Sequence, residues 1–396
     1  MNKHIIRIAI LAACVSGSQT LSAQTPLDEF LDRVAGQSFY IEAGRAEADV
    51  RIAETRSNNS PADPEIEYGY APGIEETDGH KTTYGISQSI SWPGEYAARS
   101  KYNKLEREQA ETEFQAERQD FLLRVKLLCY EIVHTQKQQD ILNWQQANAE
   151  QILDLTQKRL AQGDATSLDV NNARLNVTSA NTAWFEGKST LDTKRRQLIL
   201  LTGFDDFEVN DFGYIERSGE NVDALLAEAQ SSDVNIRTAQ LENDKSRRNI
   251  SVARGSTLPS FNIGIAGERL SASDSFLGPT IGMSIPLWGG SGQVKVAKAQ
   301  QVAAELRSKT IQTDVESSLT ELAGRARRLQ ESLEQYGSLK DVRTGIELLN
   351  KSFELKNISV LEYFTNLSFF FQIEREYLDL ELEFNQTLAE LTKFRL

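Results

Sequence analysis

Two stretches of the chain alternate hydrophobic and polar residues with a period of two. The first, at about 64–92, places on one face the side chains of Ile66, Tyr68, Tyr70, Tyr84, Ile86, Ile90 and Trp92. The second, at about 259–288, does the same with Phe261, Ile263, Ile265, Ile281, Met283, Ile285 and Leu287. Most positions of the opposite face hold Ser, Thr, Gly or Asn. This alternation predicts four strands in two hairpins, each hairpin with one apolar face.

The segments between the hairpins have the pattern of long helices. Residues 95–201 contain no proline, and Gly163 interrupts them. Leu122, Val125, Cys129 and Ile132 follow one another at steps of three, four and three, which is the spacing of a coiled-coil seam. Residues 290–392 show the same kind of spacing. The sequence therefore predicts a mostly α, α+β chain with very long helices and little sheet.

The chain also repeats its own layout. The two hairpins match at an offset of 195 positions, with Pro64 against Pro259 and Gly94 against Gly289. The segment 163–170 matches 356–363, and in both a break is followed by a small hydroxyl residue, a leucine and an acid. That order is typical of a turn between two helices with an N-cap. We expect one repeat at 24–203, an acidic connector at 204–221 and a second repeat at 222–396.

The first 23 residues have the pattern of a secretory signal peptide. Lys3 and Arg7 form a small basic region, a short apolar run follows, and small residues precede Gln24. An N-terminal anchor helix is a weaker interpretation, because the run is too short to cross a bilayer. A third interpretation is a lipoprotein box in which Cys14 is acylated.

Composition excludes several functions. Among 396 residues, 57 are acidic and 43 basic, so the net charge is −14 and nucleic acid is not an expected partner. The three histidines are His4, His80 and His134, and no metal-ligand motif, phosphate-binding loop or nucleophile motif is present. We expect no cofactor, no bound metal and no enzymatic activity.

Strands of about ten residues with one apolar face suit the wall of a transmembrane β-barrel. Four strands cannot close a barrel, and lipid does not tolerate open sheet edges. A membrane-spanning chain must then oligomerise, and three copies give twelve strands around a water-filled lumen. The alternative is a periplasmic or lipid-anchored coiled-coil scaffold or adaptor without a pore, whose hairpins pack on its own helices as ordinary sheet. The lipid-facing side chains expected in the first case are Tyr68, Tyr70, Tyr84, Trp92, Phe261, Ile263, Ile281 and Ile285.

The duplicated layout, the segment Gln88-Ser89-Ile90-Ser91-Trp92-Pro93-Gly94 and the turn at 163–170 resemble the TolC-type outer-membrane efflux family. The Gln88–Gly94 segment is most similar to its cation-efflux (CzcC/CusC-like) branch. The resemblance implies a homotrimer in the outer membrane with a twelve-stranded β-barrel and a helical barrel across the periplasm. It implies an exit duct that passively exports small molecules or metal cations. It also implies two partners, a periplasmic adaptor and an inner-membrane pump of the RND type.

The resemblance further implies that the two helix turns form the periplasmic tip. The tip turn residues are Gly163, Asp164, Thr166, Lys356, Asn357 and Ser359. Asp169 and Glu362 match the acidic position near the tip constriction, where a trimer would hold six carboxylates that attract cations. The other interpretation is that each acid caps its helix, and the two roles are compatible.

The second turn departs from the family pattern. Some members close the tip with an Arg and a Tyr at positions that hold Ile358 and Phe353 here, so we expect that latch to be absent. Where the first turn has Gly163-Asp164 the second has Lys356-Asn357, and we expect Asn357 to supply the left-handed conformation.

Overall fold

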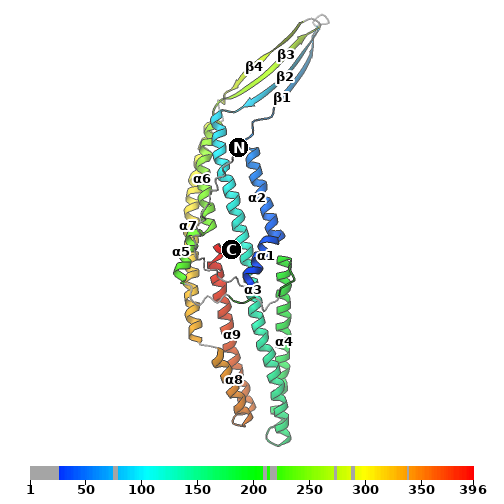
Figure 1. The fold of residues 1–396 in the computed structure, drawn as a ribbon, viewed down its shortest axis with the longest axis vertical. Coiled ribbons are helices and arrows are strands. Elements are labelled where there is room, and N and C mark those ends of the chain that lie inside the picture. The colour runs from blue at the N-terminus through cyan, green and yellow to red at the C-terminus, as the bar shows by residue number, and fades with distance from the viewer. Residues whose placement is uncertain are drawn as a thin grey trace, which may run out of the picture.

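The computed structural model describes residues 26–74, 79–207, 212–214, 221–271, 274–286, 290–336 and 339–396. The proposed signal peptide and Cys14 lie outside these residues, as do Leu287 and Gly289 of the second hairpin. The chain is elongated, with a β-sheet at one end and helices running away from it toward the other (Figure 1).

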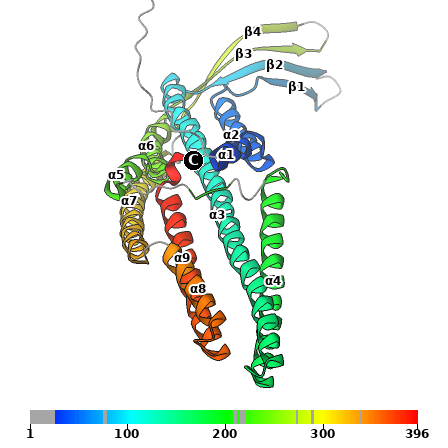
Figure 2. The ribbon, with the colours of Figure 1, turned by 60° about the horizontal axis from the view of Figure 1, so that its bottom comes forward.

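Helices make up most of the chain, as the sequence predicts. They are α1 (Pro26–Gln37), α2 (Phe39–Ser57), α3 (Pro93–Ala161), α4 (Ser167–Thr202), α5 (Val222–Ser232), α6 (Val234–Gly255), α7 (Gly290–Tyr336), α8 (Leu339–Glu354) and α9 (Val360–Leu391), followed by the short 3₁₀ helix η2 (Lys393–Arg395). With 69 residues, α3 is about 100 Å long. It begins beside the sheet and ends at the opposite end of the molecule, where α3 and α4 form one helical hairpin and α8 and α9 another (Figure 2). Within the described residues, no helix is both long and apolar enough to cross a membrane.

The sheet is antiparallel, with the strand order β1-β2-β3-β4. Its strands are β1 (Glu65–Pro72), β2 (His80–Ile90), β3 (Ser260–Leu270) and β4 (Asp274–Ser284). The first hairpin therefore pairs with the second through β2 and β3, across a long separation in sequence. The outer edges of β1 and β4 have no strand partner within the described chain.

The pairing register gives the sheet two chemically different faces. Ile66, Ile86 and Ile265 lie in one row on the apolar face, and Tyr68 and Tyr84 pair in the next. The opposite face has a matching row of Glu65, Ser87, Gly264 and Thr280, while Leu270 and Phe276 are large apolar side chains on that face nearer the hairpin loops. This separation follows from the strand period of two, because directly paired residues project to the same side.

The apolar face is not covered by the chain's own helices. Ile66 and Ile281 are each 82% exposed, and Tyr68 is 72% exposed. The sheet extends past the ends of α3, α6 and α7, so no helix lies against it (Figure 1). Two expected strand residues lie just outside the strands: Trp92 precedes the first residue of α3, and Ile285 follows the last residue of β4. The half-buried Phe261 packs against Trp92 with their ring centroids 5.9 Å apart.

The helical core forms along the seam that the sequence predicts. Val125, Cys129 and Ile132 are fully buried on α3, and Leu122 is nearly so. They belong to one cluster with residues of α1, α2 and α4, while separate clusters join α5, α7 and α9, and α3, α8 and α9. A thin helical wall therefore holds several small cores instead of one large one.

A pair of neighbouring positions on α4 tests the role of the largest cluster. Leu198 is fully buried and Gln197 beside it is exposed. Leu198→Ala removes three carbons from a packed site, so the free energy of unfolding should fall by about 2–5 kcal/mol. Gln197→Ala should change it by no more than about 0.5 kcal/mol. Denaturant unfolding followed by circular dichroism at the helical band measures both, and equal effects would show that α4 is not anchored through Leu198.

Candidate functional site: the helical tip

The first tip turn connects α3 to α4 and ends α3 with a left-handed residue. Gly163 has φ +79°. The Asp164 backbone N–H donates to Arg159 O at 2.9 Å, and the Gly163 N–H donates to Leu160 O at 3.0 Å. These two bonds are the Schellman pattern, which satisfies the last carbonyls of a helix. Glycine fits here because it adopts a positive φ without steric cost.

The second turn connects α8 to α9 with the same hydrogen bonds. The Asn357 N–H donates to Ser352 O and the Lys356 N–H to Phe353 O, both at 3.0 Å. The left-handed residue is Lys356, with φ +63°, so the expectation that Asn357 takes this conformation is wrong. The Schellman geometry requires positive φ at the residue aligned with Gly163, and the chain places lysine there.

A matching N-cap starts the helix after each turn. The Thr166 hydroxyl accepts from the Asp169 N–H at 3.2 Å, and the Thr166 N–H donates to the Asp169 carboxylate at 2.8 Å. Ser359 and Glu362 repeat this reciprocal pair at 3.2 and 2.9 Å. Both expected constriction acids are thus capping-box residues of α4 and α9.

The caps keep both acids ionised. Hydrogen bonds from the Thr166 hydroxyl and then its backbone N–H hold the pKa of Asp169 below its ordinary value. For Glu362, the backbone N–H of Ser359 and then its hydroxyl lower the pKa. Capping and charge therefore coexist at these positions, because each carboxylate accepts its bonds in the ionised form.

The two tip turns are joined to each other. Lys356 Nζ forms an ion pair with the Asp164 carboxylate across the gap between the helical hairpins. Hydrogen bonding to Lys356, with its positive charge, lowers the pKa of the Asp164 carboxyl group. Both side chains are about half exposed, so water and salt screen this contact.

A buried contact lies next to that ion pair and also joins the two helical hairpins. Arg159 on α3 donates a hydrogen bond to Phe353 O, and its guanidinium lies 4.2 Å from the centroid of the Phe353 ring. Phe353 is fully buried and packs on Tyr363, with ring centroids 4.8 Å apart. Phe353, at one of the two latch positions of the family pattern, is therefore a packing residue between α3 and α8.

Tyr363 ties three helices together through its hydroxyl group. It donates to Asn350 Oδ1 on α8 at 2.6 Å and accepts from Asn148 Nδ2 on α3 at 2.8 Å. Burial raises the pKa of Tyr363 to about 12, so the hydroxyl remains a donor throughout the neutral range. This network and Arg159 were not expected from the sequence.

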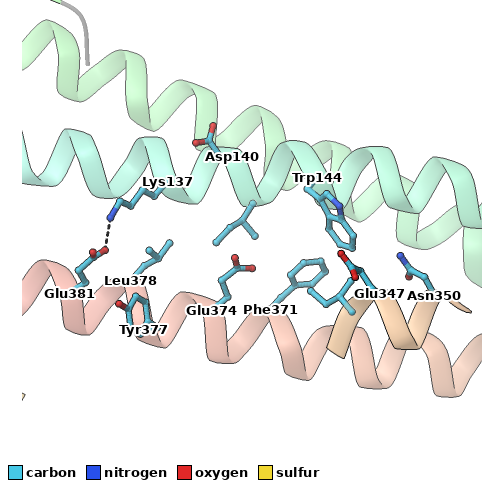
Figure 3. A pocket seen from close by; sticks show the side chains of 12 residues that line it. Lys137, Asp140, Trp144, Glu347, Asn350, Phe371, Glu374, Tyr377, Leu378 and Glu381 are labelled. Carbon is cyan, nitrogen blue, oxygen red and sulfur yellow. Dashed lines mark hydrogen bonds and ion pairs between the residues drawn. The ribbon is translucent and has the colours of Figure 1, made fainter. Parts of the chain in front are cut away.

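Above this network a groove runs between α3 and the α8–α9 pair (Figure 3). Its volume is about 630 Å³. Trp144 and Phe371 meet edge to face across it, with ring centroids 5.4 Å apart. Lys137 pairs with Glu381 at 2.7 Å, and Asp140, Glu347 and Glu374 also line the groove. Carboxylates outnumber cations among these lining residues. In the described ranges, this groove included, no three His, Cys, Asp or Glu side chains gather as a metal site would require.

Comparison with known proteins agrees with this geometry. Residues 31–204 match the family model described as "Outer membrane efflux protein". The outer membrane protein TolC of Escherichia coli (strain K12) is 24% identical over 331 residues, covering 74% of this chain and 66% of that protein. The chain thus spans slightly less than two thirds of that relative's length.

Solved structures share the fold. A CusC structure superimposes with a TM-score of 0.76 at 14% identity, covering 93% of this chain and 92% of that one. VceC from Vibrio cholerae gives a TM-score of 0.75 at 13% identity, with 93% and 95% covered. In sequence and in fold, the chain is therefore similar to the TolC-type outer-membrane efflux proteins. The matched family model and the TolC relative are both named as outer membrane proteins.

The capping carboxylates make tip stability depend on pH. Because the folded-state pKa of Asp169 and of Glu362 is lowered, the stabilisation is complete above the unfolded pKa values of about 4 and lost as pH falls through the folded values. Hydrogen-exchange protection factors in the first turns of α4 and α9 should drop between pH 7 and pH 3. In the Asp169→Asn, Glu362→Gln variant they should change little. A drop of the same size in that variant would exclude the two carboxylates as its cause.

Proposed function

We propose that three copies of this chain form an exit duct in the outer membrane, with twelve strands closing a β-barrel and the helices forming a tunnel toward the inner membrane. The observation that carries this proposal is the sheet, with its uncovered apolar face and two unpaired edges. In lipid each unpaired backbone group costs several kcal/mol, so the edge of β1 needs β4 of another copy.

The duct is passive in this proposal. Small molecules or metal cations enter at the helical tip, where a periplasmic adaptor and an inner-membrane pump of the RND type deliver them, and leave through the barrel. Membership of the CusC-like branch, and with it cation export, is part of the proposal. The CusC structures are described as showing transmembrane channel formation by that protein, which supports a pore in this one by analogy of fold. Two repeats, 24–203 and 222–396 with a connector at 204–221, are also proposed, because helix, two strands, helix, turn and helix recur in this order.

The scaffold alternative requires the hairpins to pack on the chain's own helices. The isoleucines and tyrosines of the apolar face are instead exposed, so that alternative leaves a large apolar surface in water. A lipid contact removes this cost, and the duct is therefore favoured over the scaffold.

Adjacent positions on β4 test the assignment of the two faces. Ile281 lies on the apolar face and Thr280 on the polar one. Ile281→Lys should cost up to about 2–4 kcal/mol in lipid and reduce the amount of protein recovered in outer membranes. Thr280→Lys, which adds the same charge toward the proposed lumen, should be recovered near wild-type levels. Equal recovery of the two variants would contradict lipid contact at Ile281.

Ionic selectivity tests the two acids at the tip. In a trimer Asp169 and Glu362 contribute six ionised carboxylates, which raise the local cation concentration. Asp169→Asn with Glu362→Gln should shift the reversal potential in a salt gradient across a planar bilayer toward zero. Asp314→Asn with Glu331→Gln removes the same charge from exposed positions on α7 and serves as the control. If the Asp169→Asn, Glu362→Gln variant leaves the reversal potential unchanged, the proposed ring of carboxylates is contradicted.

A further inference from the structure

A basic groove lies between α3 and α6 on the helical wall, close to the sheet. Its volume is about 640 Å³. Lys101, Lys104, Leu105 and Glu108 line it from α3, and Asp244, Arg247 and Arg248 line it from α6. A Cβ added to Gly255 at the end of α6 would meet Glu95 near the start of α3 at 3.0 Å, so these two helix ends pack side by side below the sheet. The four cations lie roughly 10–17 Å along the helices from those ends, and the sheet begins a few residues beyond them.

The four cations of this groove are not neutralised by neighbouring side chains. Glu108 is paired with Arg237, which leaves Asp244 as the other carboxylate in the lining. In the part of the chain that is described, Lys101, Lys104, Arg247 and Arg248 make no ion pair within 4.0 Å, although the charge of Arg247 also acts on Glu305. Other cations on the same helices are paired, as Lys245 is with Glu106 and Glu242. An unpaired basic cluster stands out in a chain of net charge −14.

The strand hydrogen bonds determine which side of the wall the groove faces. The Ser271 N–H donates to His80 O, so even-numbered residues of β2 direct their backbone groups at β3. Their side chains form the apolar face. Consider the sheet viewed onto its apolar face with the hairpin loops at the top. The chirality of L-amino acids then places β3 to the left of β2. Figure 1 shows the strands in this order. Figure 1 therefore views the wall from its apolar side.

In that view α3 descends with α6 on its left and α2 on its right. Asn103 faces α2, where its side chain bonds to Thr55 O. At 100° per residue along a right-handed helix, Lys104 then points toward the viewer, while Tyr102 and Glu106 point to the far side. The side chains of Lys101 and Glu108 point in directions between that of the viewer and that of α6. The groove thus opens on the same side as the apolar face of the sheet, and the paired Lys245 lies on the opposite side.

We propose that this groove binds the headgroup phosphate of an anionic phospholipid in the periplasmic leaflet of the outer membrane. The inference rests on the proposed function, because it requires the sheet to span that membrane. The headgroup layer extends several Å below the hydrocarbon, and long side chains cover the remaining distance. On α3 the side chains lean toward the helix N-terminus, which brings Lys101 and Lys104 closer to the membrane. Arg247 and Arg248 offer the guanidinium geometry that binds phosphate through two bonds.

Two features favour lipid over other anions. The groove lies within a few helical turns of the sheet, where headgroups are the nearest concentrated phosphates. It also opens outward, away from the proposed lumen, so an anion passing through the duct does not reach it. Juxtamembrane basic clusters attract anionic lipid surfaces for the same electrostatic reason.

Lipid retention by the purified full-length protein tests the proposal. The protein is equilibrated in mixed micelles of phosphatidylglycerol and phosphatidylethanolamine, and bound lipid is counted by native mass spectrometry. Wild type should retain phosphatidylglycerol with a preference of about tenfold. The Lys101→Gln, Lys104→Gln, Arg247→Gln, Arg248→Gln variant should lose most of that preference, and each pairwise variant should lose part of it.

A matched control removes the same charge elsewhere. Arg174→Gln, Lys188→Gln, Arg196→Gln and Lys351→Gln alter exposed cations on α4 and α8 and should leave the preference at the wild-type level. Equal loss in the control, or no loss in the groove variants with unchanged circular dichroism, would overturn the proposal. Displacement of the lipid by inorganic phosphate at low concentration would also count against it, since the site would then be a general anion site.

Conductance separates this inference from the proposed function. Wild-type protein that conducts in planar bilayers but shows no phosphatidylglycerol preference refutes the lipid site alone. Protein that neither conducts nor prefers an anionic lipid refutes both.

Discussion

The backbone hydrogen bonds at the edges of a four-stranded sheet constrain the rest of this structure. Pairing of β2 with β3 satisfies the inner strands, but among the residues that the structure describes no strand pairs with the outer row of N–H and C=O groups of β1 or of β4. Water tolerates such edges and lipid does not. The apolar face favours contact with lipid, but the open strand edges do not tolerate lipid. Both conditions are met only if another copy of the chain covers the edges.

At the helical end of the molecule, the backbone groups at the helix termini determine the structure. Each tip turn closes one helix with a Schellman pattern and starts the next with a capping box, so nearly the same backbone hydrogen bonds appear twice. The side chains differ in one consequential way. Lysine replaces glycine at the left-handed position of the second turn, and from there Lys356 reaches Asp164 in the first turn. A strained backbone position thus coincides with the contact that joins the two hairpins.

Features with a local period were predictable from the sequence. The alternation at Ile66, Tyr68 and Tyr70 gave the strands and their faces, and the seam through Val125 and Cys129 gave the core of α3. Caps were predictable because Thr166 and Ser359 stand three residues before an acid.

Contacts between distant helices were not predictable. Arg159 meets Phe353, and Asn148 meets Tyr363, only because the two helical hairpins lie side by side. No period or spacing in one sequence encodes that register. The basic groove was missed for the same reason, since its lysines and arginines lie on helices that are far apart in the chain and meet beside the sheet.

Disulfide trapping between the two open edges tests the central claim most directly. Glu67→Cys on β1 is combined in turn with Gly278→Cys, Thr280→Cys or Gly282→Cys on β4, all on the polar face, while the native Cys129 is buried. If three chains close the barrel edge to edge, at least one combination should give a covalent species of three chains under oxidising, non-reducing electrophoresis. Single chains or dimers in every combination, from protein recovered in the outer membrane, would contradict it.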